Sequence, residues 1–175
     1  LDYSDGGCPV LLTEPQSTNE IPYSEDFSQT SWFKLISTVV VPNTTISPDG
    51  TLNASTLQNA TGFDVTSSVL SRNIGAGLGV TSTSSIYVKS LGSTKVSLGV
   101  RVTEGGTQYP LTNHIFSDNE WVRIDLTVSL GSEQYFIGGT DGDIAIWGAQ
   151  QEHNISYATS LIKTLGSAIT RVADV

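Results

Sequence analysis

Residues 141–152, DGDIAIWGAQQE, hold the pattern that decides the fold. Ile144 and Ile146 alternate with small or aromatic neighbours, which is the two-residue period of a β-strand that buries one face. An Asp-Gly pair, typical of tight turns between strands, comes directly before them. This stretch therefore predicts a strand whose isoleucines face a core.

The same alternation runs through the middle of the chain. Segments 84–90 (SSIYVKS), 95–103 (KVSLGVRVT) and 121–130 (WVRIDLTVSL) place aliphatic residues at every second position. Turn-forming residues separate such segments at roughly ten-residue spacing. Each segment has one apolar and one polar face, so we predict an all-β fold: a β-sandwich of jelly-roll type with two antiparallel sheets.

Weaker patterns predict further strands. Residues 32–41, WFKLISTVVV, are β-branched and aromatic, which favours a single strand over a helix. Shorter strands are expected at residues 51–57, 63–74 and 134–137. In the first of these, Leu52, Ala54 and Leu57 are expected to face inward.

The length and charge of the chain limit its organisation and its partners. A chain of 175 residues suffices for one domain with a core. We assign residues 1–19 to a linker and an edge strand, and residues 20–175 to one β-sandwich whose C-terminal segment wraps back over its body. The net charge of −9 argues against nucleic acid or an anionic membrane as the main partner, because both attract basic proteins.

The chain has one cysteine and no methionine. Cys8 cannot form an internal disulfide, and it is either a packing residue or a partner for a cysteine elsewhere. No apolar run approaches the roughly 18 residues of a membrane-spanning helix. Without a signal peptide or an initiating methionine, the sequence is expected to be a module of a longer chain.

The sequence offers little for catalysis. Its two histidines lie on expected loops without metal-ligand spacing, and no GxSxG motif is present. The carboxylate pairs Glu25 with Asp26 and Asp141 with Asp143 would serve as glycosidase acid and base only if the fold placed them at a suitable separation. We therefore do not expect an enzyme.

Several stretches match one type of module. The strand IWGAQQE at 146–152 is followed by TSLIKTLGSAITRVAD at 159–174, after the opening segment EPQSTNEIPYSEDFSQTSWFK at 14–34 and the loop SPDGT at 47–51. Over residues 11–175 the chain thereby resembles a carbohydrate-binding-module-like jelly-roll domain. Such domains are found in bacteriophage tail proteins and in large secreted or cell-surface bacterial proteins.

The resemblance implies an extracellular, non-catalytic polysaccharide-binding module that anchors a larger phage tail or secreted bacterial protein to a glycan. Related modules commonly hold a structural calcium ion between an acidic first strand and an acidic last strand. By position, Glu25 or Asp26 would pair with Asp143, and carboxylate oxygens on turns suit Ca²⁺. Related modules often have consecutive aspartates in the last strand, whereas IAIW occupies that place here.

Sugar-binding residues are expected at outward strand positions, because aromatic rings stack on sugars while amides and cations bond the hydroxyls. The alternation places Tyr87 and Lys89 outward on one strand and Arg101 outward on the next. We expect these three to form one patch on adjacent strands. Trp147 and Gln150 complete the candidate set. An outward tryptophan needs a partner, which is either a loop of the protein or a ligand.

Two other functions fit the same fold. A structural spacer or oligomerisation domain of a tail fibre, without a ligand of its own, would bury its aromatic residues in the core or in contacts between chains. A polysaccharide depolymerase or lyase would need a deep cleft that contains paired carboxylates or a Tyr-Arg-His group. The sequence leaves open which glycan is bound, whether calcium is bound and the oligomeric state.

Overall fold

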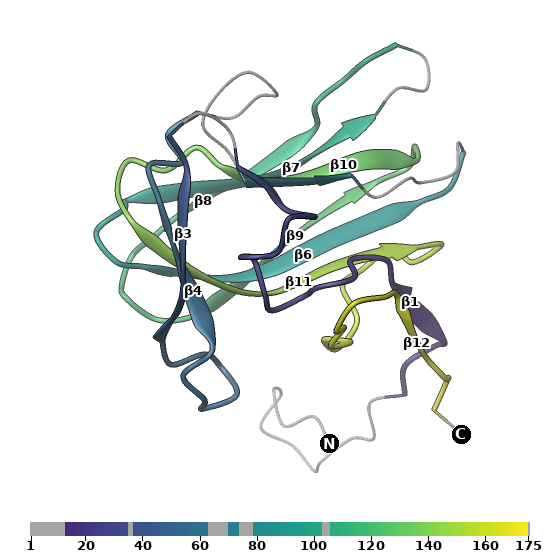
Figure 1. Cartoon of the computed structure of the whole chain (residues 1–175). Helices are drawn as coiled ribbons and strands as arrows, with labels where there is room; N and C mark the ends of the chain where they lie inside the picture. The colour runs from purple at the N-terminus through teal and green to yellow at the C-terminus, as the bar shows by residue number, and fades with distance from the viewer. Residues whose placement is uncertain (1–12, 35–36, 63–69, 74–78, 103–105, 175) are drawn as a thin grey trace.

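The computed structural model describes residues 13–34, 37–62, 70–73, 79–102 and 106–174, which form strands joined by turns and loops (Figure 1). The strands are β1 (Ser17–Asn19), β2 (Phe33–Lys34), β3 (Val39–Thr45), β4 (Ala54–Gln58), β5 (Leu70–Asn73), β6 (Ser82–Ser90), β7 (Lys95–Val102), β8 (Leu111–Ile115), β9 (Val122–Val128), β10 (Ser132–Gly138), β11 (Ile144–His153) and β12 (Ile169–Arg171). In this part of the chain, no helix is long and apolar enough to cross a membrane.

Ten of these strands form two five-stranded antiparallel sheets. Sheet A has the order β3-β4-β11-β6-β9, and sheet B has the order β2-β5-β10-β7-β8. The remaining strands, β1 and β12, pair antiparallel with each other at the border of the sandwich (Figure 1). The predicted fold class, an all-β sandwich of jelly-roll type with two antiparallel sheets, is confirmed.

The core lies between the two sheets and contains the residues that the alternation placed inward. Sheet A contributes Ile86, Ile144 and Ile146, and sheet B contributes Leu98 and Ile137, all fully buried. Burying such side chains stabilises the fold by about 1.5–3 kcal/mol each. Strands of both sheets therefore contribute side chains to one apolar interior.

Two strand predictions differ from the structure. Residues 32–41 do not form one strand: β2 pairs in sheet B, whereas β3 pairs in sheet A. The segment carries the chain from one sheet to the other, a change that its β-branched composition cannot reveal. Leu52 is 61% exposed because strand β4 begins only at Ala54. In the segment 63–74, residues 70–73 form β5, and residues 63–69 and 74 lie outside the described residues.

Strand β11 contains a bulge that changes which side chains face the core. Its register against β6 shifts between Trp147 and Gln150, and Gly148 adopts a left-handed φ of 65°. A Cβ atom on Gly148 would lie 2.9 Å from Leu161 Cδ2, so a larger residue would have neither the conformation nor the room. The bulge places Ala149 in the core and leaves both Trp147 and Gln150 on the outer face of sheet A.

The C-terminal segment, residues 154–174, crosses the outer face of sheet A before β12 reaches β1 (Figure 1). Outward side chains of the sheet hold it, as when Arg123 donates from Nη1 to the Thr159 carbonyl oxygen at 2.6 Å. The predicted wrapping of this segment over the body is confirmed. Of residues 1–19, residues 13–19 are described and contain β1, which forms a two-stranded sheet with β12. Cys8 lies outside the described residues.

Candidate functional site

The outward aromatic residues of sheet A are covered by the chain itself. Trp147 is only 4% exposed, and its ring lies 5.4 Å from that of Tyr87. The Lys163 ammonium group of the C-terminal segment sits 5.0 Å from the Trp147 ring centroid, a cation–π contact. Trp147 therefore finds its partner in the protein, and its ring is not an open stacking platform for a sugar.

Gln150 has a similar role beneath the C-terminal segment. Its side chain is fully buried. Its Nε2 donates to the Thr159 carbonyl oxygen at 3.3 Å, and its Oε1 accepts from the Ile162 backbone N–H at 2.7 Å. The amide thus replaces backbone partners that a segment outside a sheet lacks. Gln150 holds the segment and has no free face for a ligand.

Glu152, a residue that carries no motif in the sequence, joins β1 to the C-terminal segment. Its buried carboxylate accepts from Ser17 Oγ at 2.6 Å, on β1. It also accepts from the Thr159 hydroxyl at 2.5 Å and from the Thr159 backbone N–H at 3.1 Å. A lone acidic residue at a strand end carries no sequence signal for this role.

Tyr87, Lys89 and Arg101 do not form one patch. Tyr87 and Lys89 lie outward on β6 in sheet A, where the Arg123 guanidinium is 5.3 Å from the Tyr87 ring centroid. Arg101 lies on β7 in sheet B and pairs with Glu133 at 2.7 Å. The prediction of adjacent strands is wrong because β6 and β7, consecutive in sequence, belong to opposite layers of the sandwich.

The expected calcium ligands have separate partners. Glu25 forms an ion pair with Lys163 at 2.9 Å, Asp26 accepts from Gln29 Nε2 at 2.6 Å, and Asp143 accepts from Gln58 Nε2 at 2.9 Å. Nowhere in the described ranges do three or more His, Cys, Asp or Glu residues group as metal ligands. The structure therefore does not bring this ligand set together, and calcium binding stays a prediction.

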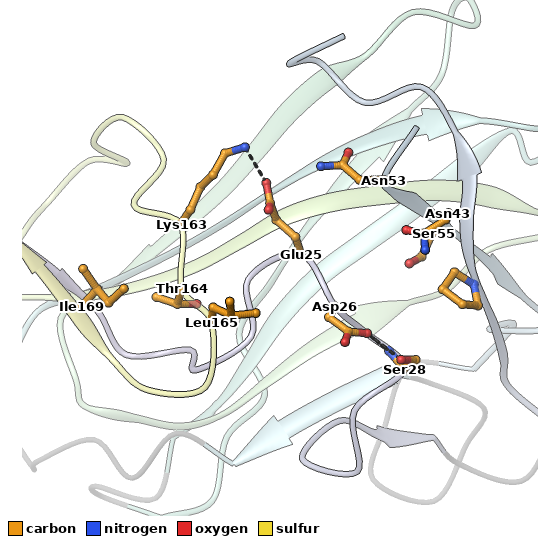
Figure 2. A pocket seen from close by; sticks show the side chains of 11 residues that line it. Glu25, Asp26, Ser28, Asn43, Asn53, Ser55, Lys163, Thr164, Leu165 and Ile169 are labelled. Carbon is orange, nitrogen blue, oxygen red and sulfur yellow. Dashed lines mark hydrogen bonds and ion pairs between the residues drawn. The ribbon is translucent and has the colours of Figure 1, made fainter. Parts of the chain in front are cut away.

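A cleft of about 530 Å³ opens between β3, β4 and the C-terminal segment (Figure 2). Glu25 and Asp26 border it from the loop after β1. The other lining residues are Ser28, Pro42, Asn43, Asn53, Ser55, Lys163, Thr164, Leu165 and Ile169. Amides, hydroxyls and carboxylates thus share the cleft with an apolar wall. This mixture suits a polar organic ligand with some apolar surface.

Lys163 fixes one side of the cleft electrostatically. Its Nζ lies 2.6 Å from Asp49 Oδ2 and 2.9 Å from Glu25 Oε1, the second contact being visible in Figure 2. The hydrogen bond to Asp49 is the main reason why the pKa of Lys163 is raised, and the hydrogen bond to Glu25 adds to it. The hydrogen bond from Lys163 likewise holds the pKa of Asp49 well below its usual value. Lys163 and Asp49 are therefore charged at neutral pH, and the lysine is already paired.

Asp26 is held in place on the opposite side. Burial raises its pKa, but hydrogen bonds from Ser28 and Gln29 outweigh burial and lower the pKa overall. Ser28 donates from both its backbone N–H and its hydroxyl to Asp26 Oδ1, at 3.0 and 2.6 Å. The carboxylate is thus preorganised and ionised at the mouth of the cleft (Figure 2).

Asn53 is the unusual group of the cleft. Its Oδ1 is buried but has no hydrogen-bond partner among the residues that the structure describes. A buried acceptor without a donor costs about 1–3 kcal/mol. On the same wall, Asn43 adopts a left-handed φ of 56°, a conformation that asparagine tolerates better than most residues. This wall of the cleft therefore contains Asn43, at the irregularity of β3, and Asn53, whose side-chain oxygen lacks a hydrogen-bond donor.

Another hollow, of about 490 Å³, lies on the outer face of sheet B. Lys95, Asn113, Leu111 and Ile115 border it, and Ser97 donates to Asn113 Oδ1 at 2.6 Å. Its polar groups are therefore partly satisfied within the sheet, and its apolar border is exposed.

Most of the cleft could not be identified from the sequence. The sequence indicates Glu25 and Asp26 as candidate residues, but as ligands of calcium. Asn43, Asn53 and Lys163 come from a strand irregularity, a strand start and a segment without periodicity, and none of these positions carries a pattern. Besides these two carboxylates, the turn SPDGT at 47–51 is a recognisable signal, and it contains Asp49, the partner of Lys163.

Solved structures with this fold include carbohydrate-binding modules. The CBM22-1 xylan-binding domain of Paenibacillus barcinonensis Xyn10C matches with a TM-score of 0.56 and 18% identity, over 81% of this chain and 94% of that domain. A mutant of the family 29 carbohydrate-binding module CBM29-2 matches with a TM-score of 0.54 and 11% identity, over 84% and 99%. At these identities the likeness shows a shared fold.

A third match belongs to a larger protein. The CBM22-1-GH10 modules of Clostridium thermocellum endo-1,4-β-D-xylanase 10B, complexed with xylohexaose, match with a TM-score of 0.55 and 16% identity. The match covers 85% of this chain and 30% of that one. No protein-family model matches the sequence, and a search of curated proteins finds no match.

Proposed function

We propose that this chain is a non-catalytic, extracellular carbohydrate-binding module that holds a glycan in the cleft between β3, β4 and the C-terminal segment. The observation that carries the proposal is the buried Asn53 Oδ1, which has no hydrogen-bond donor in the described chain. A sugar hydroxyl is a donor of the right kind. The solved structures with this fold that bind polysaccharides support the ligand class.

The remaining groups of the cleft suit the same ligand. Sugar hydroxyls both donate and accept, so carboxylates, amides and hydroxyls can each bond to them. Leu165 and Ile169 provide apolar surface beside these groups, where C–H faces of a sugar ring can pack. A catalytic role would instead require carboxylates free to act as acid and base, whereas Glu25 and Asp26 are engaged by neighbours.

The sequence resemblance supports a phage tail protein or a secreted bacterial protein as the setting. In either case the module anchors a larger assembly to a polysaccharide. One shallow site of this kind binds with a Kd of about 1 mM to 1 μM, and several copies in one assembly would bind more tightly through avidity.

A glycan-array screen followed by titration calorimetry tests this function. The isolated chain is applied to bacterial, algal and plant polysaccharides, first with calcium and then with a chelator. For a glycan that binds, Asn53→Ala is expected to weaken binding about fivefold to twentyfold, the loss of one hydrogen bond. The same substitution should leave stability unchanged or slightly higher, because it removes an acceptor that has no donor in the free protein.

Asn113→Ala is the matched control, because it removes an amide from the hollow on sheet B. It should leave the affinity unchanged. If Asn113→Ala weakens binding and Asn53→Ala does not, the glycan binds on sheet B and the cleft is not the site. If the folded chain binds nothing on a broad panel, the proposal fails in favour of a structural spacer. If the chain binds a glycan in the presence of calcium but not in the presence of the chelator, the result would support the calcium prediction.

A further inference from the structure

The cleft contains one cation, and that cation is already neutralised. Among the residues that line it, Lys163 faces Glu25 at 2.9 Å and Asp49, outside the lining, at 2.6 Å. Two carboxylates therefore share one ammonium group. An incoming anion would have to break these contacts or approach the cation together with its two existing counter-ions, and either route is unfavourable.

A second lysine near the cleft does not change this balance. Lys34 donates from Nζ to the Ser28 carbonyl oxygen at 3.2 Å, and its charge acts on Asp26. Counting Glu25, Asp26 and Asp49 against Lys34 and Lys163, the neighbourhood carries a net charge of −1. The whole chain carries −9, so the long-range field has the same sign as the local one.

The other polar groups of the lining are uncharged. The amides of Asn43 and Asn53 and the hydroxyls of Ser55 and Thr164 can donate to and accept from a neutral hydroxyl. Recognition of a carboxylate or sulfate ester instead relies on arginine forks or unpaired lysines. The residues that line the cleft include no arginine.

We infer that the cleft selects uncharged glycans and rejects glycans that carry uronic acids or sulfate esters. This inference rests on the proposed function and names the class of sugar that the same site takes. Selection comes from the paired state of Lys163 and from the carboxylates beside it. It does not depend on which neutral sugar is bound.

Matched pairs of polysaccharides test the inference, each pair differing mainly in charge. Suitable pairs are xylan with glucuronoxylan and hydroxyethyl cellulose with carboxymethyl cellulose. Affinity electrophoresis with the whole chain at low salt should show the neutral member of at least one pair binding at least about tenfold more tightly than its acidic member. The difference should shrink at about 0.5 M salt, where charges are screened.

Glu25→Gln locates the cause of the selection. The substitution removes the negative charge of one partner of Lys163. It should reduce the ratio of the affinities for the neutral and the acidic polysaccharide of a pair by about threefold to fivefold. Asp125→Asn is the control, because it removes the same charge from an exposed outward position on β9, the edge strand of sheet A opposite β3. It should leave the difference unchanged. Melting temperatures of both variants show that they are folded.

The outcomes separate the two proposals. If no member of any pair binds the folded chain, the proposed function fails and the inference fails with it. If neutral and acidic members bind equally, or acidic members bind more tightly, the module binds glycans but the inference is wrong. The inference is also wrong if Glu25→Gln and Asp125→Asn change the selection equally.

Discussion

The two outer faces of the sandwich differ in how far the rest of the chain covers them. On sheet A, outward residues such as Trp147 and Gln150 are buried beneath the C-terminal segment. On sheet B, the outward residues Leu111 and Ile115 of β8 are exposed, the latter by 76%. Both faces are built from strands with the same alternating pattern. An outward position in the sequence therefore says only that a side chain leaves the core, and the rest of the chain decides whether it meets water.

The difference also places the cleft. The C-terminal segment covers sheet A only in part, and the cleft forms where Lys163, Leu165 and Ile169 face β3 and β4 across a gap (Figure 2). One wall of the candidate site is thus a segment with little regular structure. Backbone N–H groups of that segment donate hydrogen bonds to the side chains of Gln150 and Glu152 on the sheet below it. Variants that weaken this attachment should disturb the cleft without entering it.

The largest expected effect is on the covered aromatic residue. Trp147→Ala should lower the free energy of unfolding by about 3–5 kcal/mol, because it leaves a cavity beneath the C-terminal segment. Ile115→Ala on the exposed face should change it by no more than about 0.5 kcal/mol. Urea unfolding followed by circular dichroism measures both. Similar losses for the two variants would contradict the contrast between the faces.

Gln150→Ala should have the next largest effect. The substitution leaves the buried Ile162 backbone N–H without its acceptor, which costs about 2 kcal/mol. Limited proteolysis should cut residues 154–168 faster in this variant, since the attachment of the segment is weaker. Gln108→Ala, at an exposed position, is the control and should match the wild type. Unchanged proteolysis of the Gln150 variant would mean that other contacts hold the segment.

Asp141→Asn tests the turn that links the two sheets. Hydrogen bonds from Thr94 and Ser93 lower the pKa of Asp141 below its usual value of 3.8. A lowered pKa stabilises the folded state above pH 3.8, and this contribution is lost as the pH falls through the lower folded value. The wild type should therefore exceed the variant in stability at pH 7, and the two should converge in strong acid. Urea midpoints between pH 7 and pH 2 provide the measurement, and a constant difference would contradict it.

The smallest effect is expected for the ion pair on sheet B. Arg101→Ala removes the contact with Glu133, in which both side chains are about one-third exposed. Partly exposed pairs of this kind contribute about 0.5 kcal/mol or less, and salt screens them. A loss above about 2 kcal/mol in thermal unfolding would show that the face of sheet B is more tightly organised than its exposure suggests.

The sequence predicted the layers of the fold because their signal is local. A strand with one face on the core carries apolar residues at every second position, and the sequences of β6, β7 and β9 show this period. Residues 32–41 broke the prediction because the period of a strand says nothing about which sheet it joins. The wrong prediction that Arg101 lies beside Tyr87 and Lys89 has the same cause, because the sequence does not show that β6 and β7 belong to different sheets.

The candidate site was less accessible to prediction because it depends on distant contacts. Trp147 and Lys163 meet through a segment whose sequence has neither a helical nor a strand period. The bulge at Gly148 could be suspected from a glycine within a strand, but its consequence for Gln150 could not. The missing donor of Asn53 Oδ1 is a property of packing alone, and no residue type announces it.

The pairing of β1 with β12 has a mechanical consequence. Ser17 lies opposite Arg171, and the ladder runs inward from there to Asn19 opposite Ile169. A force that pulls Ser17 and Arg171 apart would break the hydrogen bonds between β1 and β12 one pair at a time. Continued pulling would detach the segment that carries Lys163. Such a force would open the cleft before it separated strands of either five-stranded sheet. The affinity for a ligand in the cleft would therefore depend on the force applied to the module.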